Sequence, residues 1–89
     1  MSSPKPTTFE RGAVQGIVLD FAEAGDVLPM HDHELGKGHV TIVARGSCLI
    51  RYSDGRPEEK HALGAVVDPD FPHEIEALEA GTRIVNVQK

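Results

Sequence analysis

The chain of 89 residues contains few cysteines and few aromatic residues: one cysteine, no tryptophan, one tyrosine and three phenylalanines. A single cysteine excludes an internal disulfide and favours a reducing compartment, so we expect a cytoplasmic protein. Cys48 lies in an apolar run, where a small buried hydrophobic residue is expected rather than a reactive thiol. No apolar run approaches the roughly 20 residues of a membrane helix, so no membrane partner is expected.

Positive charge is also scarce, with 9 Lys and Arg against 14 Asp and Glu and a net charge of −5. Because nucleic-acid binding needs a basic surface, this balance argues against a nucleic-acid partner. The length allows one core. We expect residues 1–9, rich in Ser, Pro and Thr, to be a flexible lead-in and residues 10–89 to form a single domain.

So small a domain gains stability from association, and two-fold dimers are the commonest oligomers, so we expect a homodimer. The apolar side chains of residues 16–21 offer a surface for it, with Ile17, Leu19 and Phe21 on one face and Val18 on the other.

In place of long apolar runs, the chain has many short ones, separated by turn signals such as Asp54-Gly55. None of them sustains the period of an amphipathic helix. The runs cover residues 16–22, 27–33, 39–45, 47–52, 59–63, 65–68, 73–77 and 82–87. This pattern predicts an all-β protein of about eight short antiparallel strands, closed as a sandwich or barrel.

Histidines gather on these predicted strands. His31 and His33 are two residues apart, so on a strand they project to the same face, at a separation suited to one metal ion. His39 opens the next strand and shares its face with Thr41, Val43 and Arg45. His73 opens a later strand, in which Ile75 and Ala77 share its face while Glu74 and Glu76 point outward. His61 lies in a charged stretch and is expected to be a solvated strand residue.

These residues resemble the two motifs of the cupins, and the likeness covers nearly the whole chain after residue 9. Gly25 is followed by five residues and then by His31-Asp32-His33, and six residues separate His39 from Gly46. The second motif is similar to the segment from Gly64 through Pro69 to His73. Two departures are visible: His39 occupies the usual glutamate position, and Pro69-Asp70-Phe71 replaces the usual Pro-x-Gly turn.

The resemblance implies a small jelly-roll barrel, also called a double-stranded β-helix, that holds one divalent transition metal ion. The implied ligands are His31, His33, His39 and His73. Imidazole suits Fe, Mn, Ni, Cu and Zn, so the ligand type leaves the metal open. Four neutral ligands leave the charge of the ion uncompensated, which favours a small anionic or chelating substrate.

We expect this substrate to lie against Thr41, Val43 and Arg45, with Arg45 as a candidate anchor for an anion. The acids Asp32, Glu34, Glu74 and Glu76 fall on the outer face of their strands, and only Asp70 stands near a ligand. The pattern therefore favours chemistry at the metal over proton transfer by a side chain. The resemblance to small all-histidine cupins implies a dioxygenase-like reaction, with isomerase or lyase chemistry less expected. The alternative is a non-catalytic module that binds a metal or a small ligand, because one fold hosts many functions.

Overall fold

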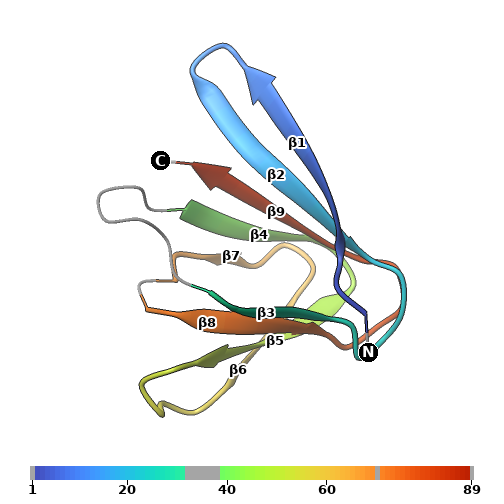
Figure 1. Ribbon diagram of the computed structural model, residues 1–89, viewed down its shortest axis with the longest axis vertical. Coiled ribbons are helices and arrows are strands. Elements are labelled where there is room, and N and C mark those ends of the chain that lie inside the picture. The colour runs from blue at the N-terminus through green and yellow to red at the C-terminus, as the bar shows by residue number, and fades with distance from the viewer. Residues whose placement is uncertain (1, 32–38, 70, 89) are drawn as a thin grey trace.

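The computed structural model describes residues 2–31, 39–69 and 71–88, and for residues 30 and 31 the backbone alone. Within these ranges the chain forms nine strands in two antiparallel sheets (Figure 1). The five-stranded sheet has the order β1-β2-β9-β4-β7, and the four-stranded sheet has the order β3-β8-β5-β6. The strands are β1 Lys5–Arg11, β2 Val14–Phe21, β3 Val27–His31, β4 His39–Arg45, β5 Ser47–Tyr52, β6 Glu59–Ala62, β7 Val66–Val67, β8 His73–Ala77 and β9 Thr82–Gln88.

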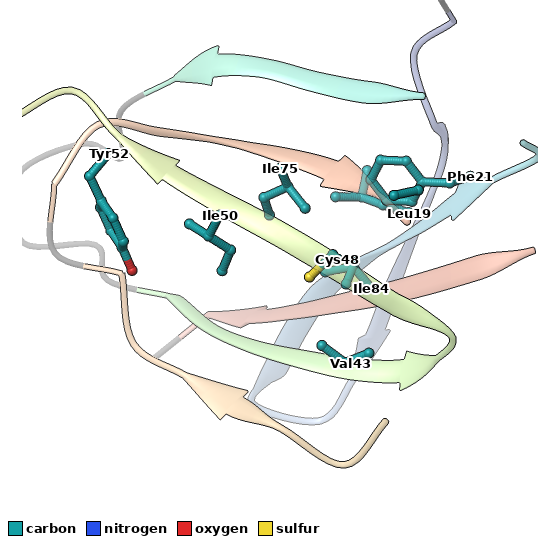
Figure 2. Close-up of a cluster of buried hydrophobic side chains, with 9 residues drawn as sticks. Leu19, Phe21, Val43, Cys48, Ile50, Tyr52, Ile75 and Ile84 are labelled. Carbon is teal, nitrogen blue, oxygen red and sulfur yellow. The ribbon is translucent and has the colours of Figure 1, made fainter. Parts of the chain in front are cut away.

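The hydrophobic core lies between the two sheets, and both sheets contribute to it (Figure 2). Its buried members are Leu19, Phe21, Val43 and Ile84 from the five-stranded sheet, and Cys48, Ile50, Tyr52, Ile75 and Ala77 from the four-stranded sheet. These residues follow the two-residue period of strands, so the predicted all-β jelly roll is confirmed. Cys48 is fully buried, as expected, and burial raises the pKa of its thiol to about 11.

The amino-terminal segment differs from the expected flexible lead-in. Residues 5–9 belong to β1, which pairs with β2 along its whole length from Lys5↔Asp20 to Arg11↔Val14. Ser2 is also tied down, because its carbonyl accepts a hydrogen bond of 2.9 Å from the backbone N–H of Val27. Strand β1 was missed because it is polar and mostly exposed, and an edge strand needs backbone pairing but no apolar face.

The apolar face of β2 is also placed differently from the expectation. Leu19 and Phe21 are buried in the core and Ile17 packs against it. This face therefore closes the barrel of one chain and is not the surface through which two chains would associate. The error arose because parity alone shows that residues share a face, whereas tertiary structure decides what covers it.

Gly46 marks the corner where the chain passes from β4 in one sheet to β5 in the other. It adopts a φ of +77°, in the left-handed region that favours glycine, and a Cβ there would clash with Thr82. The Thr82 hydroxyl is itself engaged, donating to the carbonyl oxygens of Glu79 at 2.8 Å and Ser47 at 3.2 Å. The glycine of the motif thus allows the sheets to meet closely.

No helix in the described ranges is long and apolar enough to span a membrane.

Candidate metal site at one end of the barrel

Three of the predicted histidine positions lie at one end of the barrel. The end of β3, with His31, and the starts of β4 and β8, with His39 and His73, lie on the same side of the molecule (Figure 1). We call this the histidine end, and the opposite end, around Phe21 and Gly46, the closed end. The backbone register pairs His31 with His73 across β3 and β8.

The His73 side chain is buried and held in a defined tautomer. Its relative exposure is 1%. Its Nδ1 lies 2.7 Å from the carbonyl oxygen of Phe71. Because a carbonyl oxygen only accepts, the ring must donate from Nδ1, and in the neutral imidazole the lone pair is then on Nε2. Histidines that bind metals almost always donate their other ring N–H to such an acceptor, so the chemistry of His73 fits a metal ligand.

His39 is half-buried at the start of β4 and lines a cavity of about 470 Å³. Its register partner Gln88 lines the cavity with it. The other lining residues come from the hairpin of β1 and β2, and they are Thr8, Phe9, Glu10, Gln15, Gly16 and Ile17. Thr8 is the register partner of Ile17, which packs against the core, so Thr8 and Glu10 are on the inner face of β1. The cavity therefore has a carboxylate, a hydroxyl and two carboxamides beside a histidine.

The structure does not test the rest of the predicted site. His33 lies outside the described residues, as does Asp70, and only the backbone of His31 is described. Within the described part of the chain, no group of three or more His, Cys, Asp or Glu side chains could hold a metal ion. The four-histidine centre thus stays a prediction.

The three predicted substrate-pocket residues lie at different depths along β4. Thr41 is 1% exposed, and its hydroxyl donates a hydrogen bond of 2.7 Å to Oδ1 of Asn86 on β9. Val43 is part of the hydrophobic core. Arg45 is exposed at the closed end, after a bulge in β4, and is separated from His39 by about 20 Å of extended chain. The structure therefore brings Thr41 near His39 and places Arg45 at the far end of the same strand.

Several polar residues on the inner face were not identified from the sequence. Tyr52 is 7% exposed and is the register partner of His73, with 6.0 Å between the two ring centroids. Its hydroxyl donates a hydrogen bond of 3.2 Å to Oε1 of Glu59, and Nε2 of His61 lies 3.2 Å from the same oxygen. Figure 2 shows the Tyr52 hydroxyl pointing away from β5 toward the facing sheet.

Glu59 and His61 face inward because β6 pairs them with the buried residues Ile50 and Cys48 of β5. The expectation that His61 is a solvated strand residue was therefore only partly right, since its side chain is 23% exposed and contacts Glu59. The available signal was the two-residue spacing of Glu59 and His61, which on a strand puts both on one face.

The outer face of the four-stranded sheet carries an ion-pair network. Arg51 lies 2.6 Å from a carboxylate oxygen of Glu76, 3.0 Å from one of Glu58 and 3.3 Å from one of Glu74. The hydrogen bonds to Glu76, first, and to Glu58, together with the charges of Glu76 and Glu74, raise the pKa of the Arg51 guanidinium. The outward direction predicted for Glu74 and Glu76 is thus confirmed, and their charges point away from the inner face that carries His73.

No known family model matches the sequence, and no curated protein does. Solved structures do match in fold. A cupin similar to RmlC from Desulfovibrio desulfuricans aligns with a TM-score of 0.76 at 20% identity, over 96% of this chain and 81% of its own. KdgF from a Halomonas species aligns with a TM-score of 0.77 at 15% identity, over 93% and 76%. A cupin 2 conserved barrel domain protein from Salinispora arenicola gives 0.76 at 14% identity, over 96% and 74%. The chain therefore has the cupin fold.

Proposed function

We propose that this small cupin is a metal-dependent enzyme acting on a small anionic or chelating substrate at the histidine end of its barrel. His31, His33, His39 and His73 would hold one divalent transition metal ion. The observation that carries the proposal is His73, whose buried ring donates from Nδ1 to the Phe71 carbonyl and so has its lone pair on Nε2. The pairing of His31 opposite His73 supports the same site.

A bound ion would act as a Lewis acid that polarises and orients an oxygen-rich substrate, and a redox-active ion would support dioxygenase-like chemistry. The protein's own contribution is the cavity beside His39. Among its described lining residues there is no lysine or arginine, so attraction for an anionic group would come from the ion. The side chains of Gln15, Gln88 and Thr8 supply donors and acceptors for substrate hydroxyl or carbonyl oxygens. This lining favours a hydroxylated chelator over a simple carboxylate.

A second reaction class, proton transfer by an isomerase or lyase, is favoured by one observation. From the sequence it was placed second because no acid was found on the inner face of the barrel. Glu59 supplies such an acid, hydrogen-bonded to the buried Tyr52 hydroxyl beside His73. Glu10 supplies another acid in the cavity.

The first experiment is elemental analysis of natively purified protein, with a His31→Ala, His33→Ala double variant and His61→Ala as a matched control. We expect about one transition metal ion per chain in the wild type and in His61→Ala, and none in the double variant. Metal retained at the wild-type level in the double variant would refute the site.

The reaction class is tested on the metal-loaded protein with a panel of diketones, thiols and catechols. Oxygen uptake supports the dioxygenase-like reaction, whereas incorporation of solvent deuterium without oxygen uptake supports proton transfer. Neither signal with any compound, while the same compounds still bind, would instead identify a non-catalytic binding module.

His39 is tested separately because it takes the place of the usual glutamate. His39→Glu should keep the metal but bind azide more weakly, since a carboxylate cancels one unit of the ion's charge. His39→Ala should lower metal content. Unchanged metal content and azide affinity in His39→Ala would reduce the site to three histidines.

We also propose a cytoplasmic homodimer. With the Ile17 face buried, the proposed contact is the outer edge of β1, where one row of backbone groups of an exposed edge strand is available for pairing. Light scattering at micromolar concentration tests it, and a mass of 9.6 kDa would contradict it.

A further inference from the structure

The turn between β5 and β6 contacts the segment that leads into His73. The backbone N–H of Ser53 donates a hydrogen bond of 2.9 Å to the carbonyl oxygen of Pro72. The guanidinium carbon of Arg56 lies 4.3 Å from the centroid of the Tyr52 ring and 5.3 Å from that of Phe71. Arg56 therefore contacts two rings, one on β5 and one in the segment before β8, and both distances are typical of cation–π contacts.

Asp54 orients the Arg56 side chain. Nε of Arg56 donates to both carboxylate oxygens, at 3.1 and 2.8 Å, and an Nη2 hydrogen bond of 2.6 Å reaches one of them. The backbone N–H of Arg56 donates to Asp54 as well, at 3.2 Å. Hydrogen bonds at two guanidinium nitrogens define the plane of the group, which a single contact would leave free to rotate. The cation is thus held in a fixed orientation against the two rings.

Phe71 connects this arrangement to His73. Its ring contacts Arg56, and its carbonyl oxygen accepts the Nδ1 hydrogen bond of His73 at 2.7 Å. Phe71 is 45% exposed and is not part of the hydrophobic core. Among the described residues, it is contacted by Arg56 on the ring and, one residue later, the segment is held by the hydrogen bond from Ser53 to Pro72.

We propose that Arg56 is a positioning residue for the metal site. By contacting the Phe71 ring, it holds the Phe71 carbonyl oxygen in the position where it accepts the Nδ1–H of His73 and so fixes the tautomer of that ring. The inference rests on the proposed function in one respect: the consequence of the fixed tautomer is that Nε2 of His73 is available to the metal ion. Partners of this kind, one shell outside the ligands, typically contribute 10–100-fold to metal affinity. The sequence offers no sign of the role, since Arg56 stands in a charged turn 17 positions before His73.

The test compares Arg56→Ala with Arg51→Ala. Arg51 is a matched control because it is nearby, makes three ion pairs and lies on the outer face. The first readout is the His73 tautomer in metal-free protein, from long-range ¹H–¹⁵N correlation spectra of the imidazole. The second is the dissociation constant of Co²⁺, measured by competition with a chromophoric chelator. Thermal unfolding is recorded for every variant.

In Arg56→Ala we expect a mixture of His73 tautomers and about a tenfold rise in the Co²⁺ dissociation constant, with both unchanged in Arg51→Ala. Arg56→Lys should restore only part of the effect, because an ammonium cannot form the planar contacts of a guanidinium. If Arg56→Ala does not fold, Asp54→Asn takes its place and should change both readouts in the same direction.

A single Nδ1–H tautomer and wild-type Co²⁺ affinity in a folded Arg56→Ala variant would overturn the inference. Equal losses in Arg51→Ala would also overturn it, since they would show a general effect of removing charge. Failure of the proposed function is distinguishable, because the wild type would then bind no Co²⁺ while the tautomer comparison still tests the positioning role.

Discussion

The two ends of this barrel are built from the same strands but carry different chemistry. At the closed end the inner face presents Leu19, Phe21 and Ala77, which are buried and apolar, beside the buried Thr82, whose hydroxyl is hydrogen-bonded to backbone carbonyls. At the histidine end the same sheets present Thr41, Asn86, Tyr52 and His73, which are also buried but carry polar groups. Figure 2 shows Tyr52 at the opposite end of the core from Leu19 and Phe21. Apolar burial stabilises folding, whereas a buried polar group is tolerated only with a partner. The apolar residues of the closed end therefore contribute mainly to stability, and the buried polar groups of the histidine end fit the site proposed there.

The largest effect is expected at the closed end. Phe21→Ala removes a side chain that is 1% exposed and leaves a cavity, so the free energy of unfolding should fall by about 3–5 kcal/mol. Urea denaturation measures it. Leu63→Ala is the control, because Leu63 is 70% exposed and its loss should change stability little. A loss at Phe21 no larger than at Leu63 would contradict the division between the two ends.

Metal removal should act on the opposite end. If the proposed ion is present at 100 times its dissociation constant, a chelator should lower the free energy of unfolding by about 2.7 kcal/mol. The apo protein should stay folded, because the apolar core does not include the ligands. Amide hydrogen exchange should accelerate near His73 and not near Phe21. Equal acceleration at both ends would show that the ends are not energetically separate.

Loss of one hydrogen bond at the histidine end should lower the free energy of unfolding somewhat less. Thr41→Val keeps the shape of the side chain but leaves Oδ1 of the buried Asn86 without the Thr41 donor, which should cost about 1–3 kcal/mol. A double-mutant cycle with Asn86→Leu isolates the pair, because replacing both polar groups removes the unsatisfied atom. A double variant as unstable as the sum of the single variants would refute the coupling.

The smallest effect on stability is expected on the outer face of the barrel, at the ion pair of Asp20 and Arg83. Hydrogen bonds from Arg83 lower the pKa of Asp20 below its ordinary value of 3.8. The pair therefore stabilises the fold above pH 3.8, and this contribution is lost as the pH falls through the lowered pKa of the folded state. The stability difference between wild type and Asp20→Asn should accordingly vanish in acid, and 1 M salt should reduce it at neutral pH, because exposed pairs are screened.

Much of the fold could be predicted from residue patterns. The alternation in residues 39–45 and 73–77 identified which side chains of β4 and β8 face inward, because a strand has a strict two-residue period. The same argument failed for β1, whose polar residues show no such alternation. It also misjudged the Ile17 face, since a period shows which residues share a face and not what covers them.

By itself, the sequence determined the fold class, the inward direction of His73 and the outward direction of Glu74 and Glu76, because these depend on local geometry within one strand. Only the tertiary structure decided that Arg45 lies at the closed end, that Tyr52 and Glu59 meet beside His73, and that Arg56 contacts Phe71. Each of these contacts joins different strands or turns, and their register and packing are fixed by the assembled sheets and not by any local pattern.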